Sequence, residues 1–277
     1  MRTLPECATD AHVQVFEQGR SIGPPAPLGP EPGETLSHYC AEMERVGLRR
    51  AVVVQPAAYG TDNSGTLAAV AALGPLGRGV AILSEKVSDR ELELMEAQGI
   101  TGLRSVLDHS GGMGSWEALE RLAPRAAEHG WHIDLQIAGR DWPAAESRLR
   151  ALPGSLVVEH AGLLDPPDPA GEGAASLLRL LDSGRVWVKL SAPYLSSRTG
   201  PPDYPDFAAL VGSLIRHAPD RCLWASNWPH PGRHPRPDTL DLLSLTDSWC
   251  PDESAWTRVL ETNAALLYGF AASASAA

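Results

Sequence analysis

Eight short apolar segments recur along the chain, and a helix-like amphipathic pattern follows each of them. Strands of a parallel sheet are covered on both faces, so they read as nearly continuous apolar runs. The predicted strands cover residues 6–15, 50–56, 78–83, 100–106, 132–137, 156–160, 186–190 and 221–226. The predicted helices cover residues 34–46, 63–73, 89–98, 115–129, 143–152, 173–181, 204–217 and 237–245.

This alternation predicts an α/β fold, a (β/α)8 TIM barrel. A doubly wound open sheet is the alternative, but it normally carries a glycine-rich phosphate turn after its first strand. No such turn follows residues 6–15. The length of 277 residues fits one barrel, so we expect a single domain over residues 1–277.

Composition narrows the class of partner. The net charge of −11 disfavours nucleic acid and anionic membrane surfaces. No apolar stretch approaches the roughly 18 residues of a membrane span, and the first residues lack the pattern of a signal peptide. Cys7, Cys40, Cys222 and Cys250 form no CxxC pair, so zinc-ribbon and redox motifs are disfavoured. We expect a cytoplasmic protein with a small-molecule substrate, and homo-oligomer formation stays open.

Polar residues gather at the carboxyl ends of the predicted strands. Period-two spacing places Asp10, His12 and Gln14 on one face of the first strand. Burying such groups unpaired costs about 1–3 kcal/mol each, so the set predicts a wet functional cavity at the end of the barrel that carries active sites. A hydrogen-bonded polar layer that plugs the barrel is the alternative. The other strand-end residues are Gln55, Tyr59, Arg104, Asp134, Gln136, Glu159, His160, Lys189, Ser191, Tyr194, Asn227, Trp228 and His230.

Several motifs point to a known family. The segment Asp10-Ala-His12-Val-Gln14-Val-Phe16 is similar to an opening motif Asp-x-His-x-His-Val-Phe. Further matches follow in order over nearly the whole chain. On these motifs the chain resembles the amidohydrolase-related family, and within it the 2-pyrone-4,6-dicarboxylate lactonase group. The resemblance implies a TIM barrel that acts on lactones. The further matches lie at residues 54–63, 99–104, 157–162, 186–194, 223–231 and 263–270.

Three positions depart from the pattern of that family. Gln14 replaces the second histidine, Asn227 replaces the aspartate of the eighth strand, and Leu195 replaces an arginine of the lactonase group. The resemblance implies that metal-dependent relatives hold a divalent ion with this histidine pair and this aspartate. Amides are poor zinc ligands and carry no charge to offset the ion, so we expect no metal and no cofactor. A weak site on His12, His160 and Glu159 stays open.

The resemblance also implies that, in the lactonase group, the aspartate of the eighth strand is the base that activates water. Asn227 cannot accept that proton, and general-base catalysis typically contributes about 10²–10⁴-fold. We expect His12, His160 and His230 to be the candidate bases, because imidazole titrates near neutrality. Asn227 would then donate a hydrogen bond to a carbonyl oxygen or a developing oxyanion.

The remaining predicted site residues bind substrate. Arg104 would clamp a carboxylate or a polarised carbonyl, and a salt bridge to a residue such as Asp134 is its alternative. Loss of the arginine at Leu195 suggests a less charged, more apolar substrate. The predicted substrate-binding residues are Asp10, Gln14, Gln55, Tyr59, Arg104, Gln136, Ser191, Tyr194 and Trp228.

The functional hypothesis is a metal-independent acid–base enzyme. It would open or close the ring of a small oxygenated metabolite (a lactone, pyrone or carbonyl compound) without hydrolysis, as a cyclase, lyase or dehydratase of secondary metabolism. A lactone hydrolase, a metal hydrolase with altered ligands and a non-catalytic binding protein are the alternatives.

Overall fold

The computed structural model describes residues 1–17, 33–107 and 114–271. Eight parallel strands form one sheet in the order β1 to β8, and each is hydrogen-bonded to the next. The strands are β1 Thr9–Val13, β2 Arg50–Val54, β3 Gly77–Ala81, β4 Ile100–Leu107, β5 His132–Ile137, β6 Leu156–Val158, β7 Val186–Leu190 and β8 Cys222–Trp224.

The two edges of this sheet meet, which makes it a barrel. The backbone N–H of Asn227 donates to the carbonyl of His12 (3.1 Å), and the N–H of Gln14 donates to the carbonyl of Trp228 (2.9 Å). β1 therefore pairs with the segment that follows β8. The predicted (β/α)8 TIM barrel is confirmed.

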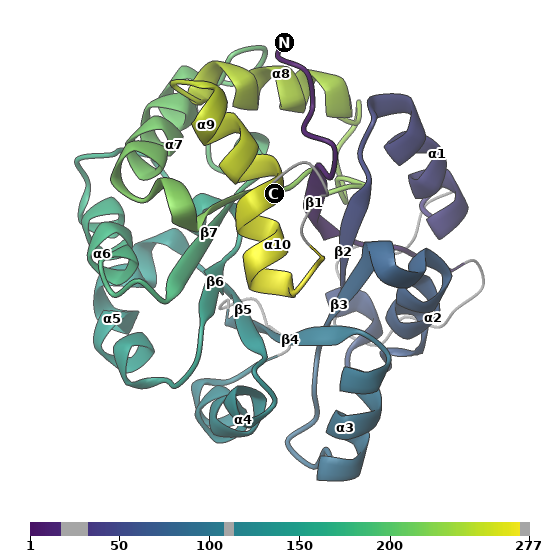
Figure 1. The fold of residues 1–277 in the computed structure, drawn as a ribbon. Coiled ribbons are helices and arrows are strands. Elements are labelled where there is room, and N and C mark those ends of the chain that lie inside the picture. Colours follow the sequence, from purple (N-terminus) through teal and green to yellow (C-terminus); the bar gives the residue numbers. More distant parts are fainter. Residues whose placement is uncertain (18–32, 108–113, 272–277) are drawn as a thin grey trace.

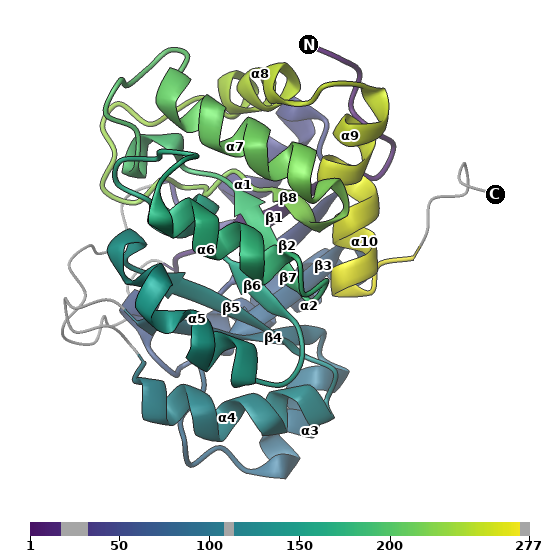
Figure 2. The ribbon, with the colours of Figure 1, turned by 90° about the vertical axis from the view of Figure 1, so that its left-hand side faces the viewer.

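Eight helices follow the strands in turn and surround the barrel (Figures 1 and 2). All eight were predicted, and the largest difference is at α8, which ends at Trp249 instead of residue 245. Local signals fix several ends: Ser88 and Glu91 form a capping box at the start of α3, and Gly47 closes α1 with a φ of 84°. The helices are α1 Leu36–Val46, α2 Ser64–Leu73, α3 Asp89–Ala97, α4 Trp116–Glu128, α5 Trp142–Ala151, α6 Glu172–Leu181, α7 Pro205–His217 and α8 Thr239–Trp249.

Several strands end earlier than predicted, and polar residues follow at once. The predicted strand 156–160 stops at Val158, because His160 and Ala161 take left-handed φ values of 52° and 49°. The predicted strand 6–15 shortens to β1, whose register against β2 shifts between Asp10 and Val13. Such irregularities commonly re-aim side chains next to active sites.

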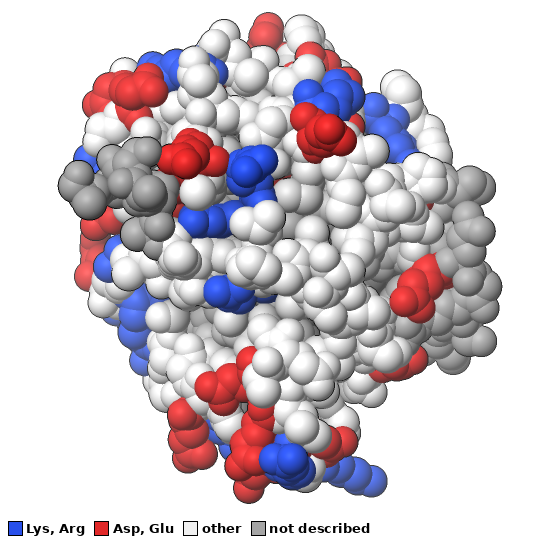
Figure 3. All heavy atoms as spheres, turned by 45° about the vertical axis from the view of Figure 1, so that its right-hand side comes forward, with Lys and Arg blue, Asp and Glu red and all other residues white. Residues whose placement is uncertain are grey.

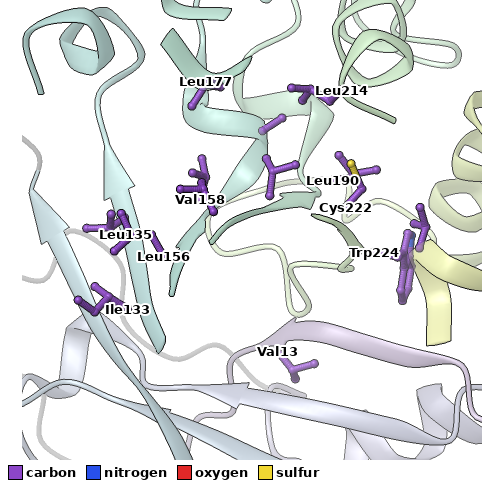
Figure 4. Packing of buried hydrophobic residues seen from close by; sticks show 14 of the residues in the cluster. Val13, Ile133, Leu135, Leu156, Val158, Leu177, Leu190, Leu214, Cys222 and Trp224 are labelled. Carbon is purple, nitrogen blue, oxygen red and sulfur yellow. The ribbon is translucent and has the colours of Figure 1, made fainter. Parts of the chain in front are cut away.

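The main core lies between the barrel and its helices. Figure 4 shows Val158 and Leu190 of the barrel near Leu177 of α6 and Leu214 of α7, all of which are buried. Burial on both faces is the reason that the strands are apolar throughout, as all five buried residues of β2 illustrate.

The segment after α8 was not predicted, and it covers the amino end of the barrel. It comprises α9 Glu253–Thr257, a π-helical turn Arg258–Thr262 and α10 Asn263–Tyr268. Asn263 donates from Nδ2 to the carbonyl oxygens of Cys222 (2.8 Å) and Pro219 (2.9 Å). Figure 1 shows α10 across the middle of the barrel, so this end is blocked.

Among the described residues, no helix is both long and apolar enough to cross a bilayer. Figure 3 shows acidic and basic side chains interspersed over the face in view.

Candidate active site

The carboxyl ends of the strands enclose a cavity of ≈ 220 Å³. Five polar side chains from five different strand ends line it, and all five belong to the predicted set. They come together because successive parallel strands bring their carboxyl ends to one side of the barrel. These residues are Gln14, Arg104, Gln136, His160 and Asn227.

The rest of the described lining is apolar. Phe16 follows β1, Pro56 follows β2, and Leu195 and Pro231 lie in the segments after β7 and β8. Leu195 keeps 41% of its surface exposed. The cavity thus combines uncharged amides and an imidazole with apolar contacts, as most small-molecule sites do.

Arg104 is held in an ion pair beneath the cavity. Its Nε and Nη2 donate to the two carboxylate oxygens of Glu159 at 2.9 and 2.8 Å. Burial is the largest single effect and would raise the pKa of Glu159, but the charge and hydrogen bonds of Arg104, together with His12 and His160, hold that pKa well below its usual value. The alternative to substrate binding was a salt bridge to Asp134, and the structure instead pairs Arg104 with the carboxylate one strand further on.

A second buried ion pair lies beside the first. Lys189 of β7 donates to Asp134 of β5 at 2.5 Å, and both side chains are fully buried. The Lys189 ammonium also lies 3.4 Å from Nδ1 of His12. Two cations therefore neutralise two carboxylates inside the barrel. These charges offset one another, as the polar-plug alternative expects, although Oδ1 of Asp134 has no hydrogen-bond partner among the described residues.

Two histidines meet above these ion pairs, with ring centroids 4.9 Å apart. Burial lowers the pKa of His160 to about 4 despite the opposing effect of Glu159, and it lowers the pKa of His12 well below its usual value. Both rings are consequently neutral at neutral pH. His160 lines the cavity and bonds through Nδ1 to Oγ of Ser191 (2.8 Å), whereas His12 is fully enclosed and bonds to Gln14 (3.2 Å).

The hydroxyl of Tyr194 links Asn227 to His230 through two hydrogen bonds. The Nδ2 of Asn227 donates to the Tyr194 hydroxyl, which also bonds to Nδ1 of His230, each at 2.9 Å. Burial lowers the pKa of His230 to about 4, and its Nε2 has no hydrogen-bond partner among the described residues. Asn227 lines the cavity, and His230 sits behind it.

Strained backbone marks the same residues. His160, Asn227 and His230 have φ values of 52°, 63° and 61°, in the left-handed region. Asparagine tolerates this conformation better than most residues, and histidine is also enriched there. Strain of this kind clusters at active sites, where the surrounding structure maintains it. Three of the four predicted catalytic residues carry it.

Six predicted substrate-binding residues lie outside the described lining, and four of them support the structure around it. The Asp10 carboxylate accepts bonds from Ser226, Tyr39 and the His12 backbone. Gln55 donates to the carbonyls of Gly60 and Asp62 and accepts from Thr66. Tyr59 packs on Phe16, and Trp228 packs on Tyr39. Their contact with substrate stays a prediction. The same holds for Ser191 and Tyr194, which hydrogen-bond to His160 and Asn227.

Among the described residues, one group of side chains could hold a metal ion, and its surroundings do not fit one. Potential ligand atoms of His12, Glu159 and His160 lie within 4.8 Å of one another. Both oxygens of Glu159 are already bonded to Arg104, and Lys189 lies against His12. A divalent ion would have to displace two fixed cations, and the neighbouring Gln14 and Asn227 add no negative charge.

Comparisons with known proteins identify the family of this chain. The amidohydrolase family model matches residues 9–270. D-Galactarolactone isomerase of Agrobacterium fabrum (strain C58 / ATCC 33970) is 32% identical, over 96% of this chain and 92% of the relative. The 2-pyrone-4,6-dicarboxylate hydrolase of Comamonas testosteroni is 30% identical, over 96% and 91%. An apo crystal structure from Agrobacterium tumefaciens superposes with a TM-score of 0.91 at 31% identity, covering 98% of both chains. The resemblance found in the motifs is confirmed: the chain is an enzyme that belongs to the amidohydrolase family.

Proposed function

We propose that the enzyme opens or closes the ring of a small lactone, pyrone or related carbonyl compound by acid–base chemistry, without a metal and without net addition of water. The observation that carries this proposal is the state of His160. Its ring is neutral, it lines the cavity, and Ser191 fixes its Nδ1. With Nδ1–H donating to Ser191, the lone pair of Nε2 can accept a proton.

The amides around the cavity supply hydrogen-bond donors for a carbonyl oxygen. Gln136 uses its Oε1 to accept from Arg104 (3.2 Å), which leaves its NH2 group for the cavity. Asn227 uses one N–H on Tyr194 and keeps a second. Fixed donors of this kind stabilise negative charge as it develops on oxygen.

The resulting step is a proton transfer coupled to one C–O bond. His160 removes a proton from a substrate hydroxyl or from a carbon beside the ring C–O bond. The hydroxyl oxygen then attacks the lactone carbonyl, or the C–H electron pair forms a C=C bond, and in both cases the ring C–O bond breaks and its electron pair stays on the ring oxygen. The imidazolium then returns the proton to the product. Atoms balance without water, so the reaction is an isomerisation, cyclisation or elimination.

The names of the relatives support both a non-hydrolytic and a hydrolytic reaction. One is named an isomerase, and an isomerisation consumes no water. Others are named hydrolases, so lactone hydrolysis is the second candidate, in which His160 would activate water. The non-hydrolytic version is preferred because Asn227 cannot act as a base at the position after β8.

Turnover in H2¹⁸O distinguishes the two versions. A panel of lactones, pyrones and their open-chain unsaturated acid isomers would be incubated with enzyme treated with chelator, and products analysed by mass spectrometry. The proposal expects turnover with no ¹⁸O retained from solvent. Incorporation of one ¹⁸O per turnover supports the hydrolase, and loss of activity on chelation overturns the metal-independent mechanism.

A further inference from the structure

The charge balance of the cavity indicates what kind of ring it accepts. From it we infer that the site selects an uncharged substrate and excludes carboxylate-bearing ones, and that Leu195 is the residue that sets this selectivity. The inference rests on the proposed function, because it names the charge class of that substrate. The Comamonas relative, in contrast, is named for a dicarboxylate.

Among the described residues of the lining, Arg104 alone carries a formal charge. Most of its N–H groups are already hydrogen-bonded to other groups of the protein. Its bonds go to both oxygens of Glu159, to Oε1 of Gln136 and to the carbonyl of Gln55. Four of its five N–H groups are therefore in use. A carboxylate that approached Arg104 would meet the negative charge of Glu159 at the same place.

Two further cations of the described residues, Lys189 and Arg233, lie outside the lining. Lys189 is fully buried against Asp134 and lies outside the lining. Arg233 stacks on the ring of Tyr194, 5.0 Å from its centroid, and donates to the Tyr194 carbonyl (3.0 Å). Its guanidinium is also absent from the described lining of the cavity.

Leu195 is the most exposed residue of the described lining. It follows Tyr194, whose hydroxyl holds Asn227, and its side chain is part of the lining while 41% exposed. With leucine there, a carboxylate would lose water and gain no counter-ion from the described part of the chain, which is strongly unfavourable. An uncharged ring loses far less water and packs on Leu195 and Phe16.

Binding of two matched probes tests this selectivity. 2-Pyrone-5-carboxylate and its methyl ester would be titrated into the full-length protein by calorimetry at pH 7.5. The ester should bind about tenfold or more tightly than the carboxylate. Leu195→Arg should tighten binding of the carboxylate by about tenfold or more through a charge-assisted pair, and should change binding of the ester by less than about threefold.

Two variants serve as controls. Leu195→Gln controls for the lost apolar contact. Leu266→Arg, at a 70% exposed site on α10, controls for net charge, and both should keep the preference for the ester.

Each outcome of these titrations either supports or contradicts the inferred selectivity. If the wild-type protein binds the carboxylate at least as tightly as the ester, the inference is wrong, while the proposed function stands because it specifies no charge. The same holds if Leu266→Arg shifts the preference as much as Leu195→Arg. If Arg233→Ala weakens carboxylate binding, Arg233 and not Leu195 sets the selectivity. If neither probe binds, the site does not accept a pyrone ring and the inference is wrong for this class of substrate, while turnover of the lactone panel in H2¹⁸O still tests the proposed function separately.

Discussion

The guanidinium of Arg104 and the carboxylate of Glu159 face each other in a two-point ion pair, at 2.9 and 2.8 Å, with both side chains buried. The pair joins β4 to the end of β6 and passes beneath the cavity. It fixes the position of the segment that carries His160, the residue next to Glu159. One contact therefore serves both the packing of the barrel and the geometry of its site.

Removing the negative charge from this pair should destabilise the protein strongly. Glu159→Gln leaves a buried guanidinium without its counter-charge, and such changes cost about 3–5 kcal/mol. Urea unfolding followed by circular dichroism measures the loss. The exposed pair of Arg90 and Glu93 is the matched control, and Glu93→Gln should change stability by less than about 1 kcal/mol. Equal losses in the two variants would contradict the structural role assigned to Glu159.

On acidification, activity should fall only at a pH far below the usual pKa of histidine. His160 acts when neutral, and burial lowers its pKa to about 4, so kcat/KM should hold from about pH 8 to 5 and fall as the pH passes through about 4. His160→Gln should lower kcat by about 10²–10⁴-fold. His217→Gln, at an exposed histidine on α7, should leave kcat unchanged. An acid limb near pH 6.5 would show that the base is a different, exposed group.

His230 should contribute stability that is lost on acidification. Burial lowers its pKa in the folded protein from 6.5 to about 4, so below pH 6.5 the unfolded chain takes up a proton that the folded protein does not. Stability from this group is present above pH 6.5 and lost as the pH falls toward 4. His230→Asn does not titrate and suits the φ of 61°. The stability difference between wild type and this variant should shrink from pH 8 to pH 5 in denaturant titrations, and a constant difference would contradict it.

The barrel was predictable because its signal is repeated, and the detail of the site was not. Eight apolar runs with polar ends determine the strands and the side of the barrel on which Gln14, His160 and Asn227 meet. The partner of Arg104 could not be chosen from sequence, since Asp134 and Glu159 lie on successive strands and the choice depends on side-chain reach. The helix α10 was missed because its six residues are too short to show a period.

The close packing of Gly102 against His132 inside the barrel could not be predicted from the sequence either. A Cβ at Gly102 of β4 would lie 2.4 Å from Nε2 of the buried His132 ring. Gly102→Ala should therefore displace that ring and cost more than about 2 kcal/mol of stability. Gly212→Ala on α7 is the matched control, because its Cβ would meet only the flexible end of Arg216 and alanine favours the helix. Thermal unfolding of the two variants should shift in opposite directions, and a similar shift in both would show that the contact is readily relieved.

Returning a carboxylate to the position after β8 should restore hydrolysis. Asn227 lines the cavity and bonds to Tyr194, which bonds to His230. In Asn227→Asp the Tyr194 hydroxyl donates to the new carboxylate, and the other oxygen of that carboxylate faces the cavity, where it can take a proton from water. A general base of this kind contributes about 10²–10⁴-fold, so lactone hydrolysis with ¹⁸O uptake should appear well above the wild-type level. Asn227→Ala removes the same amide and adds no base, and it should show no such gain. If Asn227→Ala gains hydrolysis equally, the amide blocks water instead of lacking basicity. If neither variant gains it, the missing carboxylate is not what separates this enzyme from its hydrolase relatives.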